Sequence, residues 1–106
     1  MKVEVLYLPA GGSLKKVKID PTSLDDCYEL VNGGPLESVF LTATIHLFCN
    51  EEGKILNLPY NFPYVRDGKI VDHIHGDVFF CSLDSDGEIS SLDESDEKFI
   101  YQKFAR

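Results

Sequence analysis

The chain has 106 residues, 43% of them hydrophobic and 26% charged, and a formal net charge of −8. This length and composition predict one globular domain, residues 1–106, and exclude an intrinsically disordered chain. No apolar run approaches the roughly 20 residues that cross a bilayer, and the first residues lack the features of a signal peptide, so we expect no membrane contact and a cytoplasmic protein.

The first two segments have the two-residue period of β-strands. In residues 2–8 and again in residues 14–19, apolar and polar side chains alternate. A Pro-Ala-Gly-Gly-Ser segment separates them and favours a turn. We therefore predict a β-hairpin at the start of the chain.

Residues 21–35 carry the start and stop signals of a helix. Thr22 or Ser23 can accept hydrogen bonds from the amides of the first turn. Asn32 and Gly33 can adopt the left-handed conformation that ends a helix. The helical period predicts one apolar stripe against the core, made of Leu24, Cys27, Tyr28 and Val31.

The middle of the chain predicts three short strands, 38–41, 44–50 and 54–58. The segment 51–54, Glu-Glu-Gly-Lys, is typical of a hairpin turn because glycine can take a positive φ angle there. We interpret the aromatic and proline-containing segment 57–66 as a loop that follows this hairpin.

The last third predicts two more strands and a helix. The continuous apolar run in residues 77–83 indicates a strand that is covered on both faces, and residues 88–90 form a short return strand. Ser91 and Glu94 have the spacing of a capping box at the start of the final helix. The inner face of that helix is expected to contain Leu92, Phe99, Ile100 and Phe104.

These elements predict an α+β fold with the order β-β-α-β-β-β-β-β-α. We expect a mostly antiparallel β-sheet with two helices packed on it, both against one face.

The order and content of these segments resemble a family of small phage- and plasmid-encoded proteins that is described only as a domain of unknown function (3846). The resemblance spans nearly the whole chain and is most specific in Cys-Asn-Glu-Glu-Gly-Lys at 49–54 and in Leu-Pro-Tyr-Asn at 58–61. It implies an accessory protein of a mobile element, with a role against host defences, and it brings no catalytic residues. Members typically have arginine where this chain has Phe62, and Arg66 is the candidate substitute.

The aromatic segment is the candidate binding surface. Aromatic side chains stack on bases or anchor a protein partner at low entropic cost, amides can read hydrogen-bonding edges, and an arginine can bind a phosphate. The opposing interpretation is that the same aromatic residues close the end of the core. The candidate residues are Asn57, Pro59, Tyr60, Asn61, Phe62, Tyr64 and Arg66.

Histidines provide a weaker alternative, a metal site. His73 and His75 would share one face of a strand with Asp77, and His46 could complete the ligand set. Two ligands do not make a site, however, so we expect no metal and no cofactor. Buried reduced thiols are expected at Cys27, Cys49 and Cys81, which lie among apolar residues without a CxxC spacing.

The negative charge is concentrated late in the chain. Between Asp72 and Glu97 there are nine carboxylates and neither lysine nor arginine. Such a surface repels nucleic-acid phosphates, so groove-type nucleic-acid binding is not expected. The stretch indicates either a solvated acidic face or a mimic of DNA that binds basic proteins.

No set of residues points to a catalytic reaction, so an enzyme is the less favoured class. The sequence therefore predicts a non-catalytic binding module that captures a host protein or a small nucleotide-like ligand. A metal-dependent hydrolase or nuclease built on the histidines and an acidic DNA mimic remain the alternatives. Exposed strand edges would also permit a homodimer.

Overall fold

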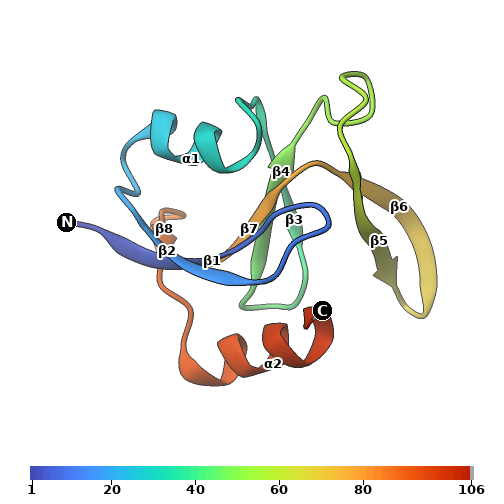
Figure 1. Cartoon of the computed structure of the whole chain (residues 1–106). Coiled ribbons are helices and arrows are strands. Elements are labelled where there is room, and N and C mark those ends of the chain that lie inside the picture. The colour runs from blue at the N-terminus through green and yellow to red at the C-terminus, as the bar shows by residue number, and fades with distance from the viewer. Residues whose placement is uncertain (106) are drawn as a thin grey trace.

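The computed structural model describes residues 1–105 and contains eight strands and two helices (Figure 1). In chain order the elements are β1 (Val3–Leu8), β2 (Lys15–Ile19), α1 (Leu24–Leu30), β3 (Leu36–Phe40), β4 (His46–Asn50), β5 (Tyr60–Arg66), β6 (Lys69–His75), β7 (Val78–Leu83), β8 (Ile89–Ser90) and α2 (Glu94–Phe104). The predicted α+β class is confirmed, and the order contains one strand more than predicted. No helix in the described part of the chain is long and apolar enough to cross a membrane.

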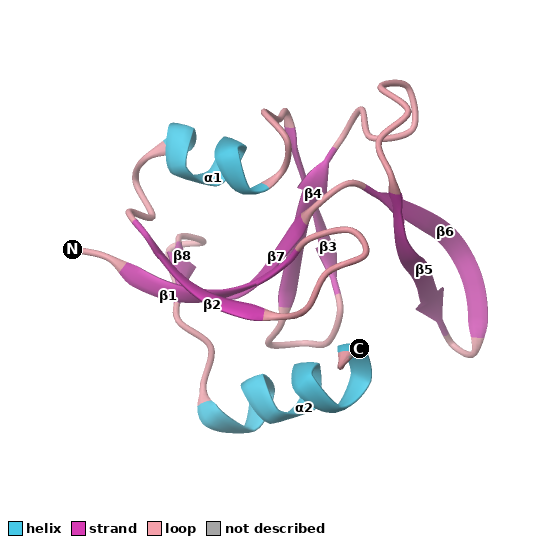
Figure 2. Ribbon diagram, viewed as in Figure 1, coloured by secondary structure: helices cyan, strands magenta, loops and turns pink. Residues whose placement is uncertain are grey.

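Two antiparallel sheets make up the β-structure (Figure 2). The main sheet has the order β2-β1-β7-β4-β3, with β8 paired to β7, and β5 and β6 form a separate two-stranded sheet. The predicted hairpin β1–β2 is confirmed by the pairing of Val5 with Val17. The chain places β7 between β1 and β4, so the centre of the sheet depends on contacts between distant segments.

The main sheet is covered on both faces. One core cluster gathers around α1 and includes Val5, Cys27 and Phe79, and the other contains Leu6, Phe80 and Ile100 of α2. Adjacent residues of β1 and of β7 therefore point to opposite clusters, which confirms the double burial predicted for residues 77–83. The expectation that both helices pack on one face is wrong, because α1 and α2 lie on opposite sides of the sheet (Figure 2).

The signals predicted for α1 are confirmed at both ends. The Ser23 hydroxyl accepts a hydrogen bond from the Asp26 amide (3.2 Å), and Asn32 and Gly33 have φ angles of 61° and 96° after the last turn. The predicted apolar stripe is correct for Cys27 and Val31 but wrong for Leu24, whose side chain is 61% exposed.

The start of α2 differs from the predicted capping box. Asp93, and not Ser91, is the N-cap residue, and its carboxylate accepts a hydrogen bond from the Asp96 amide (2.8 Å). The Ser91 hydroxyl instead accepts a hydrogen bond from the amide of Glu4 (3.1 Å). The Ser91 hydroxyl therefore bonds a residue 87 positions away and not the first turn of α2.

The strand predicted at 54–58 is wrong. Residues 51–57 form successive turns, in which the Leu56 amide donates to Glu52 O (2.8 Å) and the Leu58 amide donates to Gly53 O (2.9 Å). Because these local bonds satisfy the backbone, the segment does not pair with β4, whose neighbours are β3 and β7. Conversely, residues 60–66, which we interpreted as a loop, form strand β5.

All three cysteines are free and buried, as predicted. Burial raises the pKa of the Cys81 thiol to about 12, and burial together with Glu37 raises the pKa of the Cys49 thiol to about 12. These thiols are structural apolar groups in the folded protein.

Candidate functional site

The aromatic segment lies in the β5–β6 hairpin, which extends to one side of the main sheet (Figure 1). Asp67 and Gly68 form its turn with φ angles of 52° and 77°, the left-handed pair that matches the twist of a two-residue hairpin. The inner face packs on the core cluster of α2 through Phe62, Tyr64 and Ile74. The hairpin is therefore a fixed part of the fold.

A register shift separates the aromatic residues of β5. Pairing is irregular between Tyr60 and Phe62, and both Asn61 and Phe62 are buried there. A bulge of this kind reverses the alternation of side chains. Tyr60 thus points outward, whereas Phe62 and Tyr64 point into the core.

Three of the candidate residues hold the hairpin in place. The Asn61 side-chain amide donates to Leu8 O (3.1 Å) and to Gly76 O (2.9 Å), and the Tyr64 hydroxyl donates to Phe40 O (2.5 Å). The Phe62 ring packs against the Phe104 ring of α2, with 4.7 Å between centroids. These contacts support the interpretation of core closure for Asn61, Phe62 and Tyr64.

Two further candidate residues shape the backbone before β5. Asn57 is exposed and has a φ angle of 56°, a conformation that Asn tolerates better than most residues. The carbonyl oxygen of Pro59 accepts a hydrogen bond from the Gly76 amide (2.7 Å), which joins the beginning of β5 to the end of β6.

Tyr60 meets both histidines of β6. Its ring centroid lies 5.6 Å from that of His73 and 5.4 Å from that of His75, and its hydroxyl is 3.2 Å from His73 Nδ1. His75 Nδ1 donates to Leu58 O (3.0 Å), so this ring has a fixed orientation. The shared strand face predicted for the two histidines therefore exists, with an aromatic ring across it.

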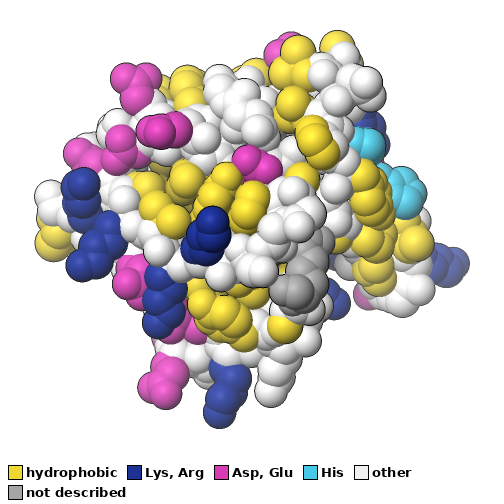
Figure 3. All heavy atoms as spheres, in the orientation of Figure 1, with side chains coloured by type: hydrophobic (Ala, Val, Ile, Leu, Met, Phe, Trp, Pro, Cys, Tyr) yellow, Lys and Arg dark blue, Asp and Glu magenta, His cyan; other side chains and the backbone are white. Residues whose placement is uncertain are grey.

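A group of apolar side chains is exposed on the same hairpin. Figure 3 shows hydrophobic side chains gathered over this part of the molecule, next to the histidines. We call the exposed group the hairpin surface, and its members are Tyr60 (48% exposed), Val65 (41%), Ile70 (59%) and Val71 (58%). Single exposed apolar residues are ordinary, whereas contiguous groups of them are typical of interaction sites.

A cleft of about 270 Å³ lies between β6 and the turns at 51–57. Ile55, which is 83% exposed, lines it together with both histidines. Lys54 Nζ and Asp72 Oδ1 form an ion pair across the cleft, and this contact lowers the pKa of the Asp72 carboxyl. The remaining charges in the lining are carboxylates, those of Glu37 and Glu51.

Arg66 lies at the other end of β5. Its Nη1 donates to the Tyr64 hydroxyl (3.0 Å), and it lines a separate cleft of about 300 Å³ with Phe40 and Thr42. Arg66 lies six positions after Tyr60 along the extended strand, a separation of about 20 Å. The predicted combination of Tyr60 with Arg66 around one small ligand is therefore not brought together.

The residues of the alternative metal site are also dispersed. His46 is buried, packs on the Phe40 ring with 4.3 Å between centroids, and has a pKa lowered by burial. Asp77 accepts hydrogen bonds from the Tyr7 hydroxyl (2.8 Å) and the Ala10 amide (2.9 Å). Within residues 1–105, no three His, Cys, Asp or Glu side chains are arranged to hold a metal ion.

Sequence reasoning missed most of the hairpin surface. Ile70 and Val71 follow the Asp-Gly turn at 67–68 after one lysine, and Val65 precedes the turn before one arginine. An Asp-Gly pair between two segments that contain β-branched residues is a signal of a hairpin, and it could have identified these residues. The exposed Ile55 and Leu56 had no such signal, because their segment resembled a strand.

The family described as "Domain of unknown function (DUF3846)" matches residues 1–105. No curated protein and no solved structure matches the chain. The match covers the main sheet, both helices and the β5–β6 hairpin, so all the sites described above lie inside it.

Proposed function

The chain belongs to the DUF3846 family, and from that premise and from its surface we propose that it is a non-catalytic binding module. It captures a protein of the host cell through the hairpin surface. The resemblance to phage- and plasmid-encoded proteins adds the setting, in which a small acidic accessory protein of a mobile element acts on a host factor.

The observation that carries this proposal is the exposure of the hairpin surface on a rigidly anchored element. The inner side of the hairpin is held on the body of the protein by the hydrogen bonds of Asn61 and by the packing of Phe62 and Tyr64. A preorganised apolar surface binds with a smaller entropic cost than a flexible loop. Tyr60 supplies an aromatic ring of the kind that anchors protein interfaces.

A nucleotide-like ligand is the less favoured partner. The cleft beside Tyr60 contains three carboxylates, of Glu37, Glu51 and Asp72, and one lysine, Lys54. This balance repels phosphate groups. Arg66, the only arginine of the predicted site, lies too far from Tyr60 to contact the same small ligand.

The other two alternatives have little geometric support. A metal-dependent hydrolase would require His46 to meet the histidines of β6, and those residues lie apart. A DNA mimic would require free carboxylates in a regular array, whereas Asp84 accepts hydrogen bonds from the Asp86 and Glu88 amides and Asp93 caps α2.

The test compares capture of host proteins by three forms of the purified protein. Val65→Thr with Ile70→Thr removes apolar area while retaining β-branched residues, so the expected change in the free energy of unfolding is below about 0.5 kcal/mol. Leu24→Gln removes an exposed leucine from α1 and serves as the control.

We expect quantitative mass spectrometry to find the same specific partner with the parent protein and with Leu24→Gln, and at least a tenfold lower yield with the double variant, which corresponds to about 1.4 kcal/mol. Equal capture by the hairpin variant, or equal loss with Leu24→Gln, would contradict the proposal. If the captured species is a second copy of the chain, the hairpin surface is a homodimer interface.

A further inference from the structure

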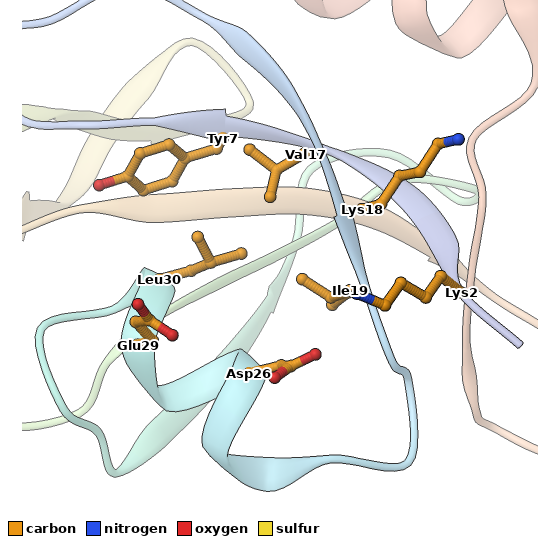
Figure 4. Close-up of a pocket in the computed structure, with 8 residues that line it drawn as sticks. All are labelled: Lys2, Tyr7, Val17, Lys18, Ile19, Asp26, Glu29 and Leu30. Carbon is orange, nitrogen blue, oxygen red and sulfur yellow. The ribbon is translucent and has the colours of Figure 1, made fainter.

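A second candidate site lies on the opposite side of the molecule from the hairpin surface, in a groove between α1 and the β1–β2 pair (Figure 4). Its volume of about 400 Å³ falls within the range of natural binding pockets. Figure 4 shows the side chains of Tyr7, Val17, Ile19 and Leu30 along this groove, between the helix and the strands. An apolar floor of this kind accepts apolar side chains.

The groove runs beside an unpaired strand edge. β2 is the last strand of the main sheet, and among residues 1–105 no strand pairs with its outer edge. An open edge presents backbone N–H and C=O groups that an extended peptide can pair with. Addition of a strand to such an edge is a recurring mode of peptide recognition, in which alternate side chains of the peptide enter a groove.

The charges of β2 indicate which peptide would fit. Its sequence, Lys-Lys-Val-Lys-Ile, contains three lysines and no acid, although the protein as a whole carries a charge of −8. Val17 and Ile19 face α1, so Lys16 and Lys18 project to the other face of the strand. Lys16 Nζ lies 3.9 Å from Glu4 Oε1 of β1 and 3.9 Å from Glu97 Oε2 of α2. Figure 4 shows the Lys18 side chain extending away from α1.

We propose that this edge binds an extended segment of a partner protein in which apolar and acidic residues alternate. The backbone of the segment pairs with β2, its apolar side chains enter the groove against Leu30, and its carboxylates lie beside Lys16 and Lys18. This site is separate from the hairpin surface and does not depend on the function proposed for it.

Lysines on an edge strand also prevent uncontrolled pairing. Two copies of β2, side by side, would bring like charges together across the strands, which is unfavourable. The same lysines attract a strand with carboxylates at the matching positions. One set of residues therefore excludes the wrong partner and selects the right one.

The rim of the groove carries charges of both signs. Lys2 and Asp26 project over it from opposite sides in Figure 4, and Glu29 lies on the helix wall. Asp26 Oδ2 already accepts a hydrogen bond from the Asp20 amide (2.9 Å). Because the positive and negative charges at the rim offset each other, the selection for an acidic peptide depends on Lys16 and Lys18 on the other face of β2.

The test uses synthetic peptides and amide chemical shifts of the labelled protein. The probe is a seven-residue peptide that alternates glutamate and valine, which covers the five residues of β2 with one residue beyond each end. A peptide of the same composition with the valines grouped together controls for the alternation, and a lysine–valine peptide controls for charge. We expect the alternating glutamate peptide alone to shift the amides of residues 15–19 and 26–30.

Charge reversal provides the second arm. Lys18→Glu is expected to weaken binding of the glutamate peptide by about 2- to 30-fold and to permit binding of the lysine peptide, because cross-strand charge pairs change sign. Lys69→Glu makes the same change of charge on the exposed turn side of β6 and should leave both peptides unaffected.

Each contrary result overturns the proposal. These results are shifts confined to β3 or to the β5–β6 hairpin, equal binding of the grouped peptide, equal weakening by Lys18→Glu and Lys69→Glu, and no shift at millimolar peptide. Concentration-dependent shifts of residues 15–19 without peptide would also overturn it, because they would show that the edge of β2 pairs with a second copy despite its lysines.

Discussion

Replacement of Asn61 by alanine tests whether one buried amide holds the β5–β6 hairpin on the body of the protein. The side chain is 6% exposed and donates to Leu8 O of β1 and to Gly76 O beyond β6. Its loss leaves two carbonyl groups without these donors in a place that water reaches poorly. It also leaves a small void where the amide was.

The expected cost follows from those two bonds. A lost hydrogen bond that leaves a buried partner unsatisfied costs roughly 1–3 kcal/mol, and the two bonds share one side chain, so we expect the free energy of unfolding to fall by about 2–4 kcal/mol. That is a large part of the roughly 5–15 kcal/mol typical of a domain. The corresponding fall in melting temperature is about 8–30 °C.

The measurement is urea unfolding followed by circular dichroism, with Asn57→Gly as the matched control. Asn57 has the same side chain four residues earlier, but it is exposed and left-handed, and glycine accepts that conformation without strain. The control should change the free energy of unfolding by less than about 1 kcal/mol. A cost below about 1 kcal/mol for Asn61→Ala, or equal costs for the two variants, would refute the reasoning.

Three further predictions concern the core and α2. Burial, followed by the hydrogen bond and the charge of Asp77, raises the pKa of Tyr7 from 10.0 to about 12. The unfolded chain therefore loses this proton at lower pH than the folded protein, and the free energy of unfolding should fall as the pH rises from 10 to 12. Urea midpoints that stay constant or increase over this pH range would contradict the prediction. The three buried thiols should react with Ellman's reagent only at the rate of unfolding, and immediate reaction of any thiol in native protein would contradict their burial. Asp93→Ala should lower the melting temperature and the helical circular dichroism signal more than Ser91→Ala does, because Asp93 caps α2. A larger effect of Ser91→Ala would instead support Ser91 as the N-cap residue.

Helix α1 shows how far local chemistry determines the fold. Ser23 and Gly33 act within a few residues of themselves, and their roles do not depend on what the helix packs against. The apolar run of β7 was equally informative, because adjacent buried residues require cover on both faces of a strand. Such features could be predicted, whereas the exposure of Leu24 depends on where the sheet lies.

The candidate site was predicted in part. The sequence singled out residues 57–66 as a binding surface and, as a separate alternative, a metal site with His73 and His75. The structure brings Tyr60 of the first set against these two histidines of the second. Pro63 favoured a loop, yet a strand of a two-stranded sheet tolerates proline on its free edge. The sequence could not show that a bulge at Asn61 would turn Tyr60 outward and Phe62 inward.

The sequence by itself determined the α+β class, the first hairpin, the ends of α1, the buried thiols and the acidic character of the chain. The tertiary structure alone decided that α1 and α2 cover opposite faces, that residues 60–66 pair with 69–75, and that Val65 and Ile70 remain exposed. The physical reason is the distance along the chain over which each interaction acts. Helix caps, turns and the periodicity of side chains depend on residues close in sequence. Which helix covers which face of the sheet depends instead on strand pairs such as β1 with β7, whose residues lie some 70 positions apart.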